Sequence, residues 1–218
     1  MADRLKGKVA IVTGAGSRGP GLGNGKATAV LFAREGASVL CVDQMKERAE
    51  ETVGLIRAEG GIAEPLAADV TQAADCEAMI ADAVTRWGGL DVLHNNVGIE
   101  SRHTLMETTE EEWDRVMAVD AKSMLLATKA AVIGFVRTCA VQLGPKAIRV
   151  NAIAPGMVWT PMVSDLGEDA RERRRKASPL GTEGSGWDVG WGAVYLASDE
   201  SRWVTGQTLI IDAGVTTR

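Results

Sequence analysis

Histidine and cysteine are scarce in this chain of 218 residues, which argues against metal sites and disulfides. The two histidines, His94 and His103, are too few for a zinc site built from imidazole ligands. The three cysteines, Cys41, Cys76 and Cys139, lie far apart and lack the close spacing of metal ligands. We therefore expect no metal site, and buried free thiols in a reducing, cytoplasmic compartment.

An excess of positive charge and long hydrophobic runs are also missing. The formal net charge is -5, which argues against nucleic acid or an anionic membrane as the main partner. No uninterrupted apolar run reaches the length of a membrane span. The first apolar run begins at Val9, which leaves no room for a signal peptide. With 45% hydrophobic residues, the chain is expected to form one domain over residues 1–218.

A glycine-rich stretch between a predicted strand and a predicted helix is the main functional signal. The apolar run 9–12 has the length and β-branched content of a buried parallel strand, and apolar residues at helical spacing follow residue 27. Six glycines lie between Gly14 and Gly25, with both included. Strand, glycine turn and helix in this order bring backbone amides and a helix N-terminus close to a phosphate.

Two phosphate-binding patterns compete for this stretch. A nucleoside-triphosphate loop fails because Pro20 stands where its first glycine belongs and Ala27 where it needs a hydroxyl. The dinucleotide pattern Gly-x-Gly-x-x-Gly is met by Gly14, Gly16 and Gly19, with the strand before it and the helix after it that it requires. A dinucleotide is therefore the expected ligand.

Strands and helices are predicted to alternate along the first half of the chain. The predicted strands cover 37–42, 63–68 and 90–94, and the predicted helices between them cover 46–59 and 71–87, with Thr71 as the cap of the second. This alternation specifies an α/β fold with a parallel sheet that is covered on both faces. Ligands bind such sheets at the carboxyl ends of the strands.

Acidic and amide side chains follow three of these strands, as Asp43, Asp69 and Asn96. Asp43 lies 20 residues after Gly23, the separation expected for the acid that accepts hydrogen bonds from the adenosine ribose. Because a carboxylate there repels a 2′-phosphate, NAD is preferred over NADP. Arg18 is the one charge in the turn that favours NADP.

Several motifs occur in an order that resembles the short-chain dehydrogenase/reductase family. They are Thr13-Gly14 with the glycine turn, Asp69-Val70, Asn-Asn-Val-Gly at 95–98, and the segments 151–156 and 205–214. The resemblance covers nearly the whole chain and implies a Rossmann-type doubly wound parallel sheet, in a single domain, that binds a nicotinamide dinucleotide. The residues expected to bind the cofactor are Gly14, Gly16, Ser17, Arg18, Gly19, Gly21, Leu22, Gly23, Asp43, Asp69, Val70, Asn96, Val97, Gly98, Pro155, Gly156, Val158 and Thr160.

The resemblance also implies a reaction whose acid/base residues are missing. Family members transfer a hydride between the nicotinamide and an alcohol or carbonyl substrate, with a serine and a Tyr-x-x-x-Lys pair at the reacting oxygen. The one tyrosine, Tyr195, is followed four residues later by Asp199, so no catalytic residue is assigned. Three functions stay open: an oxidoreductase with impaired activity, a non-catalytic dinucleotide-binding or partner subunit, and a truncated product of a longer dehydrogenase.

The missing segment can be placed by the helices that flank it. Residues 110–129 resemble the helix after the fourth strand, and residues 130–146 resemble the helix after the catalytic tyrosine. Two similar segments are joined here, and the strand and serine loop between them are lacking. If 125–129 is aligned with the catalytic motif, Lys129 takes the lysine's place and Leu125 the tyrosine's.

This join has consequences for the architecture. One helical phase runs from 109 to 143, so a helix there is expected to kink near Gly134 or to project toward a partner. The sheet is expected to be one strand short of the family's, with the strand at 148–153 adjacent to the fourth strand. The family usually dimerises through the two helices that are merged here, which implies a homo-oligomer with an altered helix interface.

Two more features are expected to have structural roles. By resemblance, 157–186 is the lid over the substrate, and its charge run at 171–176 is expected to be a solvated helix face rather than an anion site. Asp120 stands where the family usually has an asparagine, and Asp120 and Lys122 are expected to lie on a polar helix face.

Overall fold

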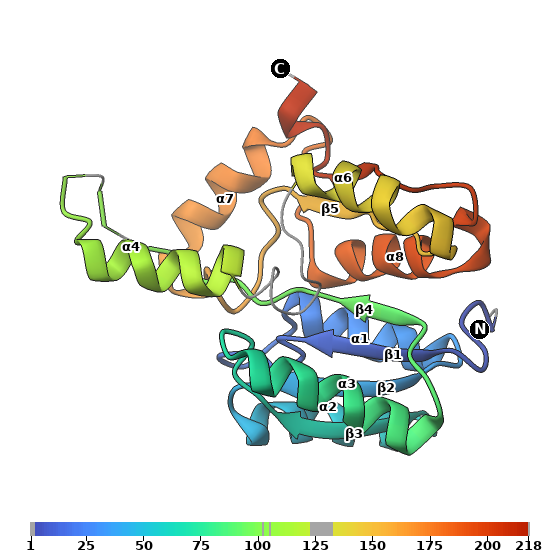
Figure 1. Cartoon of the computed structure of the whole chain (residues 1–218). Coiled ribbons are helices and arrows are strands. Elements are labelled where there is room, and N and C mark those ends of the chain that lie inside the picture. Colours follow the sequence, from blue (N-terminus) through green and yellow to red (C-terminus); the bar gives the residue numbers. More distant parts are fainter. Residues whose placement is uncertain (1–2, 102, 105, 123–132, 218) are drawn as a thin grey trace.

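Two parallel sheets form the centre of the molecule in the computed structural model, which describes residues 3–101, 103–104, 106–122 and 133–217. Four strands pair in the order β3-β2-β1-β4, and β5 pairs with β6, each pair in parallel. Figure 1 shows β4 at the edge of the larger sheet that is nearest to β5. The strands are β1 (Val9–Thr13), β2 (Ser38–Asp43), β3 (Ile62–Ala67), β4 (Val92–His94), β5 (Ala152–Pro155) and β6 (Thr208–Ile211).

Helices connect these strands and cover them. The α-helices are α1 (Asn24–Arg34), α2 (Lys46–Ala58), α3 (Ala73–Trp87), α4 (Glu110–Met117), α6 (Ile133–Leu143), α7 (Glu168–Ala177) and α8 (Gly186–Ala197). A π-helical turn, η1 (Ala118–Lys122), continues α4. The 3-10 turns are η2 (Gly144–Lys146), η3 (Ser164–Leu166), η4 (Asp199–Ser201) and η5 (Val215–Thr217). Within the described residues, no helix is long and apolar enough to cross a membrane.

The two faces of the larger sheet are covered by different helices. Successive side chains of a strand point to opposite faces, and those of β1 enter two apolar clusters. Ala10 and Val12 pack with α1, α2 and α8, whereas Val9 and Ile11 pack with α3. Phe32 of α1 is 1% exposed, and burial of a side chain of this size contributes about 1.5–3 kcal/mol. The prediction of a doubly wound α/β fold is confirmed.

Helix α8 holds the smaller sheet beside the larger one through α1. Two glycines of α8 permit the close approach: a Cβ on Gly190 would lie 2.8 Å from Leu31 Cδ1, and one on Gly186 would lie 3.0 Å from the carbonyl oxygen of Gly23. The same helix packs on β5 and β6. Helix packing, rather than strand pairing, therefore joins the two sheets in the described part of the chain.

The predicted place of β5 is wrong in two respects. The strand covers Ala152–Pro155 rather than 148–153, and it pairs with β6 instead of lying next to β4. The Arg149 guanidinium donates at 2.8 Å to the carbonyl oxygen of Leu196 at the end of α8. Packing of α8 against α1 and this anchor decide where the strand lies, against the usual tendency of consecutive strands to be neighbours.

The start of α3 and the helical run 109–143 differ from a simple interpretation of the sequence. Thr71 does not cap α3, because the N-cap is Gln72 and the Thr71 hydroxyl donates to Asp69 Oδ1 at 2.7 Å. The helical run predicted over 109–143 is not one straight helix, since α4 and α6 are offset from one another in Figure 1. The join itself, with Leu125 and Lys129, lies outside the described residues.

Candidate functional site

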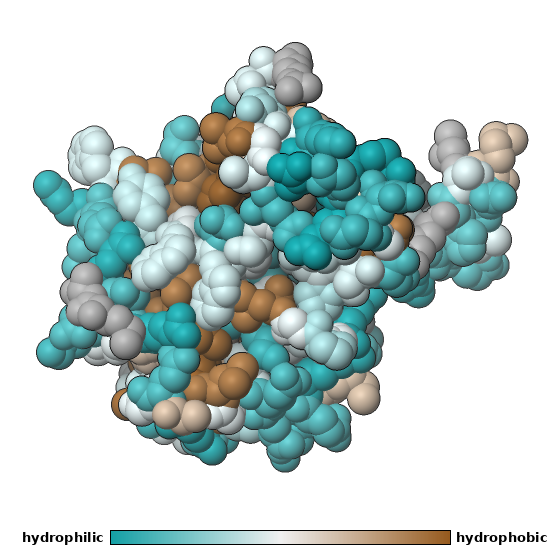
Figure 2. All heavy atoms as spheres, turned by 180° about the vertical axis from the view of Figure 1, so that it is seen from behind, coloured by the Kyte–Doolittle hydropathy of each residue, from teal (hydrophilic) through white to brown (hydrophobic). Residues whose placement is uncertain are grey.

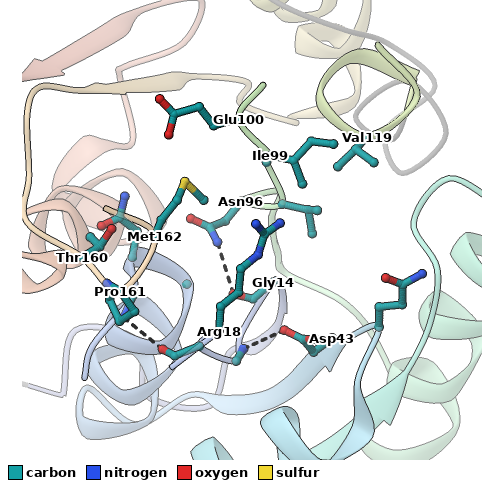
Figure 3. Close-up of a pocket in the computed structure, with 18 of the residues that line it drawn as sticks. Gly14, Arg18, Asp43, Asn96, Ile99, Glu100, Val119, Thr160, Pro161 and Met162 are labelled. Carbon is teal, nitrogen blue, oxygen red and sulfur yellow. Dashed lines mark hydrogen bonds between the residues drawn. The ribbon is translucent and has the colours of Figure 1, made fainter. Parts of the chain in front are cut away.

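A cleft of about 760 Å³ opens at the carboxyl ends of β1, β2 and β4. Its lower wall is the glycine turn between β1 and α1, and a second wall comes from the segment that follows β5. Figure 3 shows Thr160 and Met162 on one side of this cleft and Ile99 and Val119 on the other. The cleft therefore lies where parallel α/β sheets bind their ligands.

The glycine turn is tied to the end of β2 through Asp43. The Gly16 N–H donates to Asp43 Oδ2 at 3.1 Å, and the Met45 N–H donates to Oδ1 at 3.0 Å. A Cβ on Gly16 would lie 2.8 Å from the same carboxylate oxygen and 2.4 Å from Arg48 Cβ. Glycine is thus required for the turn to reach the carboxylate, and Asp43 is fixed at the rim of the cleft.

Gly25 is a residue of this site that sequence reasoning missed. It lines the cleft in the first turn of α1, and a Cβ there would lie 2.1 Å from the carbonyl oxygen of Gly14. The Gly-x-Gly-x-x-Gly pattern drew attention to the first half of the turn, yet α1 begins at Asn24 with Gly23 as its N-cap. The Gly-Leu-Gly triplet at 21–23 directly precedes α1, and these glycines could have indicated from the sequence where the helix begins.

Asn96 links the turn to the end of β4. Its side-chain Nδ2 donates to the carbonyl oxygens of Thr13 and Gly14, both at 3.3 Å, and its backbone N–H donates to Thr13 Oγ1 at 3.1 Å. The first of these carbonyls ends β1, so Asn96 closes the crevice between two neighbouring strands. Figure 3 shows the Asn96 amide directed toward Gly14.

Asp69 and Val70 line the cleft beside β3. Asp69 Oδ1 accepts hydrogen bonds from the Thr71 N–H at 2.9 Å and from the Thr71 hydroxyl at 2.7 Å. The Asp69 N–H donates to Asp75 Oδ2 at 2.8 Å. These hydrogen bonds fix Asp69 at the wall of the cleft.

The second wall follows β5. The Gly156 N–H donates to the carbonyl oxygen of Ile211 at 2.8 Å, and a Cβ on Gly156 would lie 2.5 Å from Asp212. The Trp159 N–H donates to the carbonyl oxygen of Gly184 at 2.8 Å. These bonds fasten residues 155–160 to β6 and to the segment before α8.

Asp120 makes a contact that its predicted place on a polar helix face did not suggest. Its Oδ1 accepts the Ile99 N–H at 2.8 Å. Asp120 lies in η1, whose neighbouring residues Ala118 and Val119 line the cleft. A π-helical turn often marks a functional site, and this one positions the segment after β4. Lys122 is exposed, as predicted.

Most of the predicted cofactor-binding residues meet in this cleft. Gly19, Gly21 and Leu22 are the ones that do not line it. A Cβ on Gly19 would meet nothing within 4 Å, and Gly21 adopts a positive φ of 117°. These residues shape the turn rather than its inner surface.

Titratable groups near the cleft differ strongly in environment. Burial lowers the pKa of His94 from 6.5 to about 4, and its buried Nε2 atom has no hydrogen-bond partner in the part of the chain that the structure describes. The ring lies edge-on to Phe32, with centroids 6.1 Å apart. His94 is thus neutral near pH 7 and packs against Phe32 of α1. Four arginines, Arg18, Arg48, Arg115 and Arg174, line the cleft.

The only tyrosine of the chain does not reach the cleft. Tyr195 lies in α8, and the lining residues include no tyrosine. Among the described residues, no group of three or more His, Cys, Asp or Glu side chains is arranged to hold a metal ion.

Comparison with known proteins identifies the family. The family described as short chain dehydrogenase matches residues 8–128, and the one described as Enoyl-(Acyl carrier protein) reductase matches residues 125–216. The chain belongs to the short-chain dehydrogenase/reductase family. Among curated members of this family, 3-oxoacyl-(acyl-carrier-protein) reductase FabG of Thermotoga maritima is 36% identical over 248 aligned residues, which cover 97% of this chain and 99% of that protein. The 2,5-dichloro-2,5-cyclohexadiene-1,4-diol dehydrogenase LinX of Sphingobium indicum is 34% identical over 250, covering 98% of each.

Solved structures of short-chain dehydrogenases/reductases share the fold. One from Burkholderia xenovorans superposes with a TM-score of 0.91 at 35% identity and covers 99% of this chain and 98% of its own. One from Mycobacterium marinum has a TM-score of 0.90 at 26% identity, with coverage of 100% and 98%. The arrangement of strands and helices is therefore that of the short-chain dehydrogenase/reductase family.

Proposed function

We propose that this protein binds a nicotinamide dinucleotide, NAD in preference to NADP, and that it turns over an alcohol or carbonyl substrate slowly or not at all. The observation that carries the binding proposal is the Asp43 carboxylate, fixed in the cleft by the N–H of Gly16 at 3.1 Å. A carboxylate at this place accepts hydrogen bonds from the ribose hydroxyls of the adenosine half and repels a 2′-phosphate.

The groups around the turn fit such a ligand. The Asn24 Oδ1 atom, in the first residue of α1, is buried and has no hydrogen-bond partner within the described ranges, so a ligand hydroxyl would satisfy it. The first turn of α1 carries no acidic residue, and its N–H groups and helix dipole favour a phosphate. Gly16 and Gly25, where side chains would clash with the protein itself, let the turn pack closely against the ends of β1 and β2.

With the adenosine ribose at Asp43 and a phosphate at the N-terminus of α1, the other residues of the cleft can be assigned to parts of the dinucleotide. Asp69 and Val70 would contact the adenine, and the N-terminus of α1 would hold the pyrophosphate. Residues 96–98 and 155–160 would flank the nicotinamide. The nicotinamide supplies the carbon that gives or takes the hydride when the cofactor is bound, whereas this chain's residues bind, orient and exclude water.

Slow turnover follows from what faces the substrate side. A proton donor or acceptor is needed at the substrate oxygen, and the one tyrosine lies in α8, outside the cleft. Loss of a positioned acid/base group typically lowers a rate by about 10²–10⁴-fold. The names of the relatives, a reductase and a dehydrogenase, support a carbonyl or alcohol as the substrate class.

The proposed internal gap has support of its own. The alignment with the Thermotoga protein spans 248 residues, more than the 218 of this chain, so at least part of that protein has no counterpart here. The two family matches meet at residues 125–128, next to the join proposed from the sequence. This placement favours a chain that lacks one internal segment over a chain with scattered changes.

A cofactor-binding subunit without catalysis and a truncated product of a longer dehydrogenase are the alternatives. The exposed helix α4 favours the first of them, since none of its residues is buried and Trp113 and Met117 are 57% and 42% exposed. Figure 1 shows α4 extending away from the sheets, and Figure 2 shows apolar groups at the surface of the opposite face. We therefore propose an oligomer with an altered helix interface, which light scattering would test.

A cytoplasmic location is the compartment that fits the cysteines. Cys41, Cys76 and Cys139 are free and buried. Burial raises the pKa of the Cys41 thiol to about 12, so it stays protonated and inert near neutral pH. Free thiols of this kind are typical of a reducing compartment.

One titration tests the proposed function. NADH and NADPH are titrated against the purified protein with fluorescence as the readout, followed by assays on a panel of secondary alcohols and ketones. Tighter binding of NADH than of NADPH with weak or absent turnover is expected. Turnover as fast as that of a dehydrogenase with an intact Tyr-x-x-x-Lys pair, assayed in parallel, would contradict the catalytic part. Absence of binding by either dinucleotide would contradict the whole proposal.

A further inference from the structure

The basic run 171–176 on α7 contains both paired and unpaired cations. Three of its cations form ion pairs of 2.5–3.3 Å with glutamates of the same segment, Arg171 with Glu183 and both Arg175 and Lys176 with Glu172. The side chains of Arg173 and Arg174 form no ion pair or hydrogen bond with any described residue. Arg173 is exposed, whereas Arg174 is half-buried. The run is therefore not uniformly a solvated helix face.

Arg174 differs from its neighbours because it lines the cleft. Its Nε atom is buried and has no hydrogen-bond partner among the described residues. Buried donors in folded proteins almost always have an acceptor, and an N–H donor withdrawn from water without one is unfavourable. The missing acceptor is thus expected from a molecule that occupies the cleft.

The surroundings of Arg174 strengthen its attraction for an anion. Met162 and Val163, which line the same cleft, are apolar, and Val163 is 8% exposed. Apolar walls reduce the screening of a charge within a cleft. Glu100 is an acid of the lining, but it is exposed and forms no ion pair with Arg174. The arginine is therefore not neutralised by the protein within the described residues.

We propose that Arg174 binds an anionic group, a carboxylate or a phosphate, of the molecule that fills the lid side of the cleft. The planar guanidinium suits both groups, since each can accept two parallel hydrogen bonds from it. The anion belongs either to a substrate or to the dinucleotide itself. The inference rests on the proposed function, because it takes the cleft to be the ligand site of a short-chain dehydrogenase/reductase.

Matched variants on α7 test the proposal. Arg174→Gln removes the positive charge and the paired N–H donors of the guanidinium. Arg173→Gln removes an equal charge from the neighbouring, exposed position. Dissociation constants are measured for acetoacetate, neutral methyl acetoacetate, inorganic phosphate and NADH, each alone and the first three again with saturating NADH. We expect Arg174→Gln to weaken at least one anionic probe about tenfold or more, and Arg173→Gln to leave it unchanged.

The pattern among the probes identifies the source of the anion. If Arg174→Gln weakens the binding of acetoacetate or phosphate but not of NADH, the anion belongs to the substrate. If it weakens only the binding of NADH, the anion is a phosphate of the cofactor. Methyl acetoacetate, which has no charge, should bind equally to both variants. Arg174→Lys should restore part of the affinity, and circular dichroism melting checks that each variant is folded.

Several results would overturn the inference. These are equal effects of the two glutamine variants, no effect of either, or no saturable binding of any anionic probe to the wild-type protein. Failure of the proposed function is a separate result, namely no binding of NADH or NADPH to the wild type. An anion whose binding depends on Arg174 would stand even then, because acetoacetate and phosphate are also titrated without a dinucleotide.

Discussion

A Cβ atom on Gly25 would lie 2.1 Å from the carbonyl oxygen of Gly14 and 2.5 Å from Asn96 Nδ2. The first turn of α1 thus rests directly on the backbone at the end of β1. The atom that blocks a side chain here is a backbone oxygen, so it cannot move aside as the end of a flexible side chain would. This contact sets how closely α1 approaches the strand, and with it the shape of the proposed phosphate site.

Gly25→Ala is expected to destabilise the protein, although alanine normally favours a helix over glycine. Overpacking of this kind costs typically about 1–3 kcal/mol. A loss of about 2 kcal/mol corresponds to a fall in Tm of roughly 4–8 °C for a chain of this size. Differential scanning calorimetry measures the change, and NADH binding should weaken in parallel.

Gly19→Ala is the control for this variant. Gly19 lies in the same turn, a Cβ there meets nothing within 4 Å, and its φ is not positive. Its Tm should stay within about 2 °C of the wild type, as expected for surface substitutions within about 0.5 kcal/mol. Equal behaviour of the two variants would mean that the close approach at Gly25 is not what limits the turn.

The sequence predicted the general layout of the fold better than the contacts between its elements. Strand β1, the helix after the turn and the polar ends of β2 and β4 follow from local patterns, because apolar period and glycine content are properties of short segments. Gly25 was missed because Gly14, Gly16 and Gly19 already satisfy the dinucleotide pattern in the sequence. Only the distance between α1 and β1 shows which glycine cannot be replaced.

Asp43→Asn is expected to reduce the preference for NADH over NADPH. The amide keeps one oxygen acceptor but loses the charge, and a hydrogen bond to a charged group contributes about 1.5–3 kcal/mol. NADH should therefore bind roughly tenfold or more weakly, while NADPH loses the repulsion of its 2′-phosphate and should be less affected. Fluorescence titration of both dinucleotides against the wild type and the variant measures the ratio.

Arg18→Gln tests the positive charge of Arg18, which favours NADPH, separately from the Asp43 carboxylate, which favours NADH. Arg18 lines the cleft and is exposed, so removing it should leave NADH binding unchanged and weaken only NADPH. If the wild type binds NADPH more tightly than NADH and this variant reverses the order, Arg18 rather than Asp43 sets the preference.

The misplaced strand and the unpaired arginine show what a sequence does not reveal. Adjacency of β5 to β4 was predicted from chain order, yet the contact of α8 with α1 holds β5 elsewhere. The run 171–176 was interpreted as a solvated face because five of its six residues carry a positive charge, and such charge runs are usually solvated. Arg174 is distinguished by burial within the folded cleft, and burial of one member of a charge run depends on tertiary packing.

Stability is expected to fall on mild acidification because of His94. Burial holds its pKa at about 4, against 6.5 for an exposed histidine. Below pH 6.5 the unfolded chain takes up a proton that the folded chain does not, so the stability present above pH 6.5 is lost progressively until about pH 4. The loss amounts to about 1.4 kcal/mol by pH 5.5. Denaturant unfolding at several values between about pH 7.5 and 5 measures it.

His94→Gln is the control for the pH dependence. The amide does not titrate, so the free energy of unfolding should change little over this window even if the variant is less stable throughout. Aspartates and glutamates titrate mostly below about pH 5, which leaves the upper part of the window to histidine. A slope that persists in the variant would assign the effect to another group.

Asp120→Ala should weaken dinucleotide binding, although Asp120 is proposed to act through Ile99 and not by touching the ligand. The variant leaves the Ile99 N–H without the carboxylate that accepts it at 2.8 Å, and an unsatisfied buried donor costs about 1–3 kcal/mol. The segment at 97–99 lines the cleft, so both Tm and NADH affinity should fall. Asp120→Asn keeps the oxygen acceptor and should match the wild type in both measurements. Equal damage by alanine and asparagine would show that the negative charge of Asp120, rather than its hydrogen bond to Ile99, supports the cleft.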